Sequence, residues 1–173
     1  LIEQGGQRMR VMKGAVRAVA AACGLTQPAI EALEARVAES ALKGYRTLAV
    51  ARGSESGDLE VIGLVTLYDP PRPDAKQLIA ELRDLGVSVK ILTGDALAVA
   101  SEIAQRVGLS NIRRVAELKA EAARANRDTG DLLADVDGFA EVYPEDKYIV
   151  VKHLQAAGHV AGMTGDGVND APA

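Results

Sequence analysis

The chain has 173 residues, of which 48% are hydrophobic and 25% charged, with a formal net charge of −4 at pH 7. This length and composition are typical of one globular α/β domain, or of one domain with part of a second, and they exclude a disordered chain. The acidic balance and the 3% of aromatic residues argue against a nucleic-acid partner, because such proteins present basic faces and stacking platforms.

The sequence contains no candidate membrane segment or signal peptide. Its longest uncharged apolar stretch, residues 18–30, includes Gly24 and Pro28 and is shorter than the roughly 20 residues that span a bilayer. The single cysteine, Cys23, excludes an internal disulfide, and its alanine-rich surroundings predict a small buried side chain. Because the chain begins at Leu1 and stops just after a loop signal, we interpret it as a piece of a longer protein.

Residues 1–66 predict an α+β domain that lacks strands needed to close its sheet. Thr26 and Pro28 are typical of a helix start, and Gly44 is typical of its end. A polar turn over residues 53–58 separates two apolar runs, which predicts a β-hairpin. The expected elements are an extended run at 8–13, a helix at 27–43, and strands at 47–51 and 59–67.

Residues 67–173 predict an incomplete α/β domain. Three prolines between residues 69 and 73 form a rigid breaker, which is typical of a hinge between domains. Strands and helices then alternate, which predicts a parallel, Rossmann-type sheet with helices on both faces. The expected elements are helices at 75–85, 97–107, 120–133 and 144–157, and strands at 87–92, 111–115, 139–142 and 159–163.

One short pattern occurs twice, each time after a predicted strand. Thr93-Gly94-Asp95 follows the strand that ends at Leu92, and Thr164-Gly165-Asp166 follows the strand that ends at Met163. Ligands of open α/β sheets bind at the carboxyl ends of the strands. Glycine and aspartate are also common in ordinary loops, but two copies in one sheet favour a binding site.

The second copy continues to Asn169 and Asp170 and supplies two carboxylates and an amide on a glycine-rich loop. Such hard oxygen ligands, completed by water and a substrate phosphate, suit Mg²⁺. Lys147 lies early in the helix that Pro144 opens. If that helix packs beside the two aspartate loops, its ammonium group could neutralise a transferring phosphoryl group; otherwise Lys147 is a solvated charge.

The terminal block resembles the hinge signature of the P-type cation-transporting ATPases, a family with a haloacid-dehalogenase-like phosphorylation domain. The block is Met163-Thr164-Gly165-Asp166-Gly167-Val168-Asn169-Asp170-Ala171-Pro172-Ala173. Further blocks similar to the family occur in the family's order: residues 13–15, 44–49, 69–72, 92–95 and 144–147. The stretch at residues 137–144 most resembles the proton-pumping plasma-membrane branch.

The resemblance implies that residues 1–66 end a nucleotide-binding domain and that 67–173 form most of a phosphorylation domain, with ATP and Mg²⁺ as cofactors. Lys13 would contact ATP near the adenine, Arg46 would contact its phosphates, and Asp69 and Arg72 would lie at the hinge near the nucleotide. Thr93, Gly94 and Asp95 would hold the phosphoryl group and nucleotide, and Lys147 would neutralise the aspartyl phosphate. Asp166 would bind Mg²⁺, while Asn169 and Asp170 would hold the phosphate and its surroundings.

The chain departs from the family in two respects. Val16 and Arg17 stand where the family usually has Pro and often Glu after Lys-Gly-Ala, which weakens the assignment of Lys13. The Asp-Lys-Thr-Gly-Thr block with the phosphorylated aspartate is absent, and we expect it upstream of Leu1. The longer protein would be an integral-membrane cation pump, and this chain would lie at the cytoplasmic face of its membrane.

Two alternatives remain open. Asp135 and Asp137 form an Asp-x-Asp pair like that of haloacid-dehalogenase-type phosphatases, although the pair follows the first Thr-Gly-Asp loop instead of preceding it. The isolated chain could also be a non-catalytic module that binds Mg²⁺ and nucleotide. We expect weak Mg²⁺ binding and no sustained ATP turnover from the isolated chain.

Overall fold

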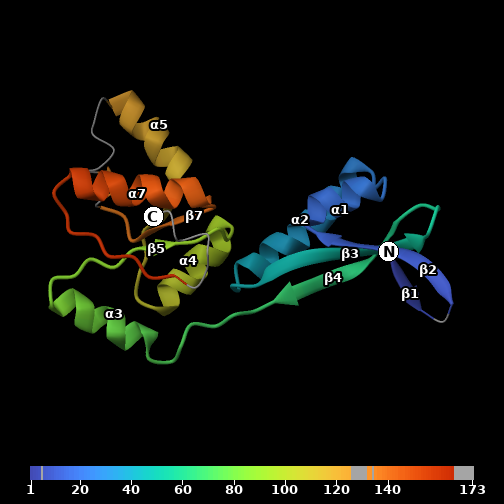
Figure 1. Cartoon of the computed structure of the whole chain (residues 1–173), viewed down its shortest axis with the longest axis horizontal. Helices are drawn as coiled ribbons and strands as arrows, with labels where there is room; N and C mark the ends of the chain where they lie inside the picture. Colours follow the sequence, from blue (N-terminus) through green and yellow to red (C-terminus); the bar gives the residue numbers. More distant parts are fainter. Residues whose placement is uncertain (5, 126–131, 134, 166–173) are drawn as a thin grey trace. The chain divides into compact units, whose positions relative to one another are not determined.

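The structure, a computed structural model, describes residues 1–4, 6–125, 132–133 and 135–165 (Figure 1). The chain divides into two compact units, Leu1–Asp69 and Pro70–Ala173, and the division falls inside the proline-rich stretch. Among the described residues, no helix has the length and apolar character that crossing a bilayer requires.

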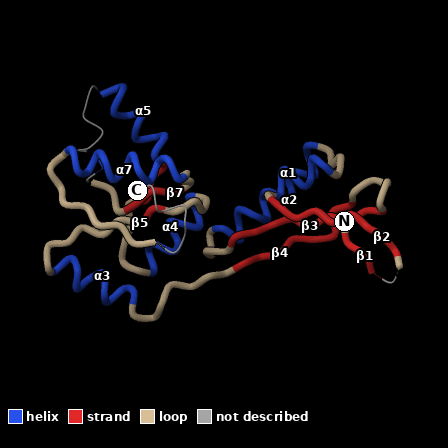
Figure 2. The backbone as a smooth tube through the Cα atoms, viewed as in Figure 1, coloured by secondary structure: helices blue, strands red, loops and turns tan. Residues whose placement is uncertain are grey.

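The first unit is an antiparallel sheet with two helices (Figure 2). Its strands lie in the order β1-β2-β3-β4. Their bounds are Ile2–Gln4, Gln7–Gly14, Arg46–Ser54 and Glu60–Leu67. The helices are α1, Val16–Ala22, and α2, Gln27–Ala41, with Thr26 as N-cap and Pro28 in the first turn, as predicted. Helix α1 was not predicted.

The helices of the first unit cover one face of this sheet. Ala49 and Ala51 of β3 are fully buried and cluster with Val16 and Val19 of α1. Because side chains alternate across a strand, the intervening residues of β3 lie on the opposite face. That face is more open: Val65 of β4, which pairs with Leu48, is 46% exposed.

The second unit contains a parallel sheet with helices on both faces, so the predicted α/β class is confirmed. Its strands lie in the order β5-β7-β6, and β7 pairs in parallel with both neighbours. The strands are β5, Ile91–Leu92, β6, Ile112–Arg114, and β7, Gly138–Ala140. The helices are α3, Ala75–Asp84, α4, Leu97–Arg106, α5, Val115–Ala125, and α7, Pro144–Ala156.

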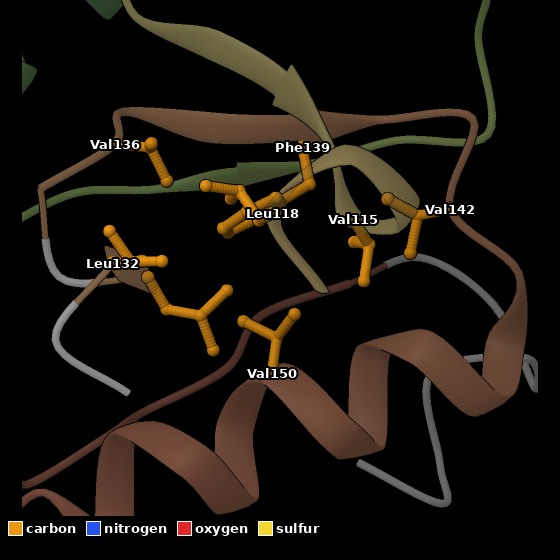
Figure 3. Close-up of a cluster of buried hydrophobic side chains, with 8 residues drawn as sticks. Val115, Leu118, Leu132, Val136, Phe139, Val142 and Val150 are labelled. Carbon is orange, nitrogen blue, oxygen red and sulfur yellow. The ribbon is translucent and has the colours of Figure 1, made fainter. Parts of the chain in front are cut away.

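Neighbouring residues of the central strand face different helices. Phe139 is fully buried in a cluster with Leu118 of α5 and Val150 of α7 (Figure 3). Ala140 belongs to the other cluster, which includes Ala104 of α4 and has Ile79 of α3 packed against it. Helices α5 and α7 therefore cover one face, and α3 and α4 the other.

The close approach of β5 and β7 explains the glycine that begins β7. A Cβ atom built on Gly138 would overlap the backbone carbonyl oxygen of Ile91. The two strands are joined there by a 3.0 Å hydrogen bond from the Ile91 N–H to the Asp137 carbonyl. A side chain at residue 138 would therefore push the strands apart.

Three expected elements of the second unit differ most from the structure. Residues 159–163 form no strand, because a strand needs a hydrogen-bonded neighbour and none of the described strands pairs with this segment; Val160 is fully exposed. The strand predicted at 87–92 is reduced to Ile91–Leu92, since residues 87–90 do not pair with β7. The helix predicted at 120–133 starts earlier, at Val115, and part of its predicted range lies outside the described residues.

Candidate functional site

The loops that follow β5 and β7 are joined at the carboxyl edge of the parallel sheet. The Thr93 N–H donates a 3.0 Å hydrogen bond to the Phe139 carbonyl, and the Thr93 carbonyl accepts one of 3.0 Å from the Val142 N–H. The Glu141 N–H donates to the Asp95 carbonyl at 2.9 Å. Residues 93–95 are therefore held in place by the end of the central strand.

The side chains of Thr93 and Asp95 contact each other in this loop. The Thr93 hydroxyl donates to Oδ2 of Asp95 at 3.1 Å, and its oxygen accepts the Asp95 N–H at 3.1 Å. Both residues are half-buried, whereas Gly94 is exposed. A Cβ on Gly94 would meet only the Val142 carbonyl oxygen at 3.6 Å, an ordinary contact, so local packing does not itself require glycine here.

Lys147 lies in the first turn of α7, which starts four residues after β7 ends. Asp146 fixes this turn: its Oδ2 accepts the Tyr143 N–H at 3.3 Å, and its Oδ1 accepts Lys119 Nζ at 3.1 Å. Lys147 itself is half-buried. Because α7 follows the carboxyl end of β7, its first turn lies at the same sheet edge as Thr93 and Asp95.

Glu141 also belongs to this edge, although it was not among the predicted residues. Its Oε2 accepts Arg114 Nε at 2.7 Å, and its Oε1 accepts the Leu97 N–H at 3.3 Å. The hydrogen bond from Arg114 lowers the pKa of Glu141, partial burial opposes this, and the Leu97 N–H adds to the lowering. The partners lie 27 and 44 residues away in the chain, so no local pattern points to them.

In the first unit, Lys13 and Arg46 lie on the same face of the sheet. Lys13 of β2 pairs with Val50 of β3, and Arg46 precedes Val50 by four residues on the same strand. Their attachment points are therefore about 14 Å apart along the strand direction. This is the face opposite the buried Ala49 and Ala51, and both residues are exposed.

Asp69 ends the first unit and Arg72 lies near the start of the second, both within the proline-rich stretch, and both are exposed. The Arg72 guanidinium donates two hydrogen bonds to Asp74, of 2.7 Å and 3.1 Å. This interaction lowers the pKa of Asp74. A nucleotide phosphate at Arg72 would therefore compete with a carboxylate that is already in place.

The other predicted residues of the site, Asp166, Asn169 and Asp170, lie outside the described residues. Thr164 and Gly165 are described and exposed, but no strand precedes them. Within the described part of the chain, no group of three or more His, Cys, Asp or Glu residues could hold a metal ion. The structure thus brings Thr93, Asp95 and Lys147 to one edge of the sheet. The binding of Mg²⁺ by Asp166 stays a prediction, because Asp166 lies outside the described residues.

The Asp-x-Asp pair lies at the opposite edge of the sheet, where β7 begins. The Asp137 carboxylate accepts N–H groups of Ser110 and Asn111, at 2.8 and 3.0 Å, and Arg83 Nη2 at 3.2 Å. Burial raises the pKa of Asp137, but the two N–H groups, with Arg83 and Lys90, outweigh it and lower the pKa. A carboxylate engaged in this way holds elements together, which disfavours the use of Asp137 as the acid/base of a phosphatase.

The chain matches known proteins along its whole length. The family model of the haloacid dehalogenase-like hydrolases matches residues 3–173. A probable plasma membrane ATPase of Dictyostelium discoideum is 40% identical over 100% of this chain and 16% of its own length. Plasma membrane ATPase 1 of Saccharomyces cerevisiae is 40% identical over 96% of this chain and 19% of its own length. A putative cation-transporting ATPase of Methanocaldococcus jannaschii is 39% identical over 96% of this chain and 21% of its own length.

The chain spans about a fifth or less of the length of these relatives, from 16% to 21%. Their names confirm the resemblance to cation-transporting ATPases that the motifs indicated. The parallel sheet and its flanking helices agree with the matched family model. The chain belongs to the haloacid dehalogenase-like hydrolases.

Proposed function

We propose that this chain is part of the catalytic region of an ATP-driven P-type cation pump. Residues 1–66 would end its nucleotide-binding domain, and residues 67–173 would form most of its phosphorylation domain. The observation that carries the proposal is the set of hydrogen bonds that joins the Thr93–Asp95 loop to residues 139–142, which lead into α7 at the same sheet edge. The similarity to plasma membrane ATPases over nearly the whole chain supports it.

The residues at the sheet edge would hold a phosphoryl group. The Thr93 hydroxyl would donate a hydrogen bond to a phosphoryl oxygen, and Asp95 would orient that hydroxyl through the 3.1 Å contact already present. The Lys147 ammonium would neutralise negative charge on the phosphoryl group. Phosphoryl transfer depends mainly on positioning and charge neutralisation, so these are the roles that it requires.

Mg²⁺ fits the oxygen-donor chemistry of this edge. A Mg²⁺ site usually needs only one or two carboxylates, with water and substrate phosphate completing it, and therefore no larger acidic cluster. We propose Asp166 as the carboxylate that binds the ion, with Asn169 and Asp170 holding the phosphate and its surroundings. Bound Mg²⁺ would neutralise phosphate charge.

ATP would bind to the first unit through Lys13 and Arg46, which share one sheet face. Asp69 and Arg72 would form the hinge near the nucleotide, and movement about it would bring ATP to the acceptor. The acceptor aspartate would belong to an Asp-Lys-Thr-Gly-Thr block, which is absent from these 173 residues.

The transported ion would be a proton, because residues 137–144 resemble the proton-pumping branch.

The test asks whether radiolabelled ATP, with Mg²⁺, transfers its phosphoryl group to an aspartate of the full-length protein. Such a label is stable in acid and is released by hydroxylamine. We expect labelling of the full-length protein and its loss in Lys147→Ala. Lys152→Ala is the matched control, because Lys152 is an exposed lysine later on the same helix, where it contacts the Tyr148 ring. Absence of labelling in the full-length protein would contradict the proposal.

The isolated chain is expected to behave as a non-catalytic module that binds Mg²⁺ and nucleotide. The observation that favours this second function is the absence of the Asp-Lys-Thr-Gly-Thr block from the sequence. ATP-dependent labelling of the 173-residue chain alone would contradict this expectation. Hydrolysis of a generic phosphate ester that disappears in Asp135→Asn would instead support the phosphatase alternative.

A further inference from the structure

The loop that carries Thr93 and Asp95 makes several hydrogen bonds with residues 139–142. Three of the contacts are backbone hydrogen bonds of 2.9 to 3.0 Å between the loop and this segment: the Thr93 N–H donates one, and the Thr93 and Asp95 carbonyls accept the other two. The fourth contact comes from a side chain: the Glu141 carboxylate accepts the Leu97 N–H at 3.3 Å. Leu97 is the first residue of α4, and the loop runs directly into it.

Glu141 adopts a backbone conformation that is unfavourable for its residue type. Its φ angle is +56°, and it is the only residue other than glycine with a positive φ in the described part of the chain. A left-handed conformation at a residue with a Cβ persists only where surrounding contacts hold it. Here the Glu141 N–H donates to the Asp95 carbonyl, and the Glu141 carboxylate accepts hydrogen bonds from the Leu97 N–H and from Arg114 Nε.

Arg114 fixes the direction of the Glu141 carboxylate. It lies at the end of β6, on the other side of the central strand from β5, and its Nε bonds Oε2 of Glu141 at 2.7 Å. Its Nη1 bonds Glu117 of α5 at 2.8 Å. Glu141 follows β7, and its carboxylate contacts the end of β6 and the start of α4 while its N–H contacts the loop after β5.

We propose that Glu141, oriented by Arg114, is a positioning residue for the phosphate site. Its N–H and carboxylate hold Asp95 and Leu97, and thereby set where the Thr93 hydroxyl and the Asp95 carboxylate lie. The identity of the ligand rests on the proposed function. The Glu141 side chain is 43% exposed, and exposed ion pairs contribute little to overall stability, so its main effect is local order.

The test uses the ¹⁵N-labelled 173-residue chain and two measurements. Without ligand, amide hydrogen exchange in Glu141→Ala should accelerate about tenfold at Leu97, whose N–H loses its hydrogen bond to a charged acceptor. The acceleration should be smaller at Asp95, whose N–H bonds the Thr93 hydroxyl and is affected only through the loosened loop. Exchange at Phe139 and Val150 should be unchanged. With Mg²⁺ and ATP added, the shift changes at Thr93–Asp95 should need several times more ligand than in the unaltered chain.

Two further variants separate positioning from general stability. Glu141→Gln keeps an oxygen that can accept the Leu97 N–H, so it should restore slow exchange at Leu97 at least in part. Glu102→Ala removes a comparable ion pair, with Arg106 on α4, and should leave exchange at Asp95 and Leu97 unchanged. Unchanged exchange at both residues in Glu141→Ala, or equal acceleration throughout the second unit, would overturn the positioning role.

The ligand measurement tests the proposed function separately. If Mg²⁺ and ATP cause no shift at Thr93–Asp95 in the unaltered chain, nucleotide binding by this chain fails as a function. The exchange data without ligand would still support or overturn the ordering of the loop by Glu141. The two failures are therefore distinguishable.

Discussion

The Asp137 carboxylate accepts a 2.8 Å hydrogen bond from the Ser110 N–H, 27 residues earlier in the chain. This contact ties the start of β7 to the loop between α4 and β6, at the sheet edge opposite Asp95. Asp95 and Asp137, which lie at opposite edges of the parallel sheet, therefore have different environments. Asp137 is engaged by N–H groups and Arg83, whereas Asp95 contacts a hydroxyl in a loop at the carboxyl edge, where open α/β sheets usually bind ligands.

Asp137→Ala should lower the free energy of unfolding by about 2–3 kcal/mol, because it leaves the Ser110 and Asn111 N–H groups without their charged acceptor. Urea denaturation followed by circular dichroism measures the change. Asp135→Ala is the matched control and should change stability by less than about 0.5 kcal/mol, since Asp135 is exposed. Equal effects of the two substitutions would contradict the structural role of Asp137.

Stability should fall as the pH is lowered below about 5. The pKa values of Asp137 and Glu141 are lower in the folded chain than their ordinary values near 4. Their contribution is therefore complete above the unfolded pKa and is lost as the pH falls through the folded pKa. Unfolding measured from pH 6 to pH 3 should show this loss, and Asp137→Asn should reduce the slope. A slope unaffected by Asp137→Asn would rule out Asp137 as a contributor.

Gly138→Ala should destabilise the second unit by about 1–3 kcal/mol, because the new Cβ would overlap the Ile91 carbonyl oxygen. Gly162→Ala is the control, since a Cβ there meets nothing within 4 Å. It should change the free energy of unfolding by less than about 0.5 kcal/mol. Thermal unfolding of both variants provides the comparison, and a neutral Gly138→Ala would argue against the close pairing of β5 and β7.

Phe139→Ala should cost about 3–5 kcal/mol, because the ring is fully buried between the sheet and helices α5 and α7 (Figure 3). Tyr148→Ala is the comparison: Tyr148 lies on α7 and is 44% exposed, so its loss should have a much smaller effect. Denaturant midpoints of the two variants test the difference. Similar midpoints would contradict the assignment of Phe139 to the core.

The sequence predicted those elements whose signals are local. Pro144 and Gly158 bounded the helix that the structure shows as Pro144–Ala156, and Thr26 marked the start of α2. The alternation of strands and helices predicted a parallel sheet, and its polarity placed Thr93 and Asp95 at the carboxyl edge.

Other features depend on partners far away in the chain. The apolar residues at 159–163 suggested a strand, but strand formation needs a hydrogen-bonded neighbour, which no local pattern specifies. Glu141 was missed because its importance arises from Arg114, Leu97 and a positive φ angle. The alanine-rich α1 was missed because its sequence offers no capping side chain and only seven residues.

In the proposed function, Thr93, Asp95 and Lys147 line one site for phosphate and a divalent cation. The most direct measurement is paramagnetic broadening of the ¹⁵N-labelled chain by Mn²⁺, used in place of Mg²⁺, in the presence of ATP. We expect selective broadening of the amide signals of Thr93, Gly94, Asp95 and Lys147, while Ser110 and Asp137 at the opposite sheet edge stay sharp. Broadening centred on Asp135 and Asp137, or spread over unrelated surface carboxylates with residues 93–95 unaffected, would contradict it.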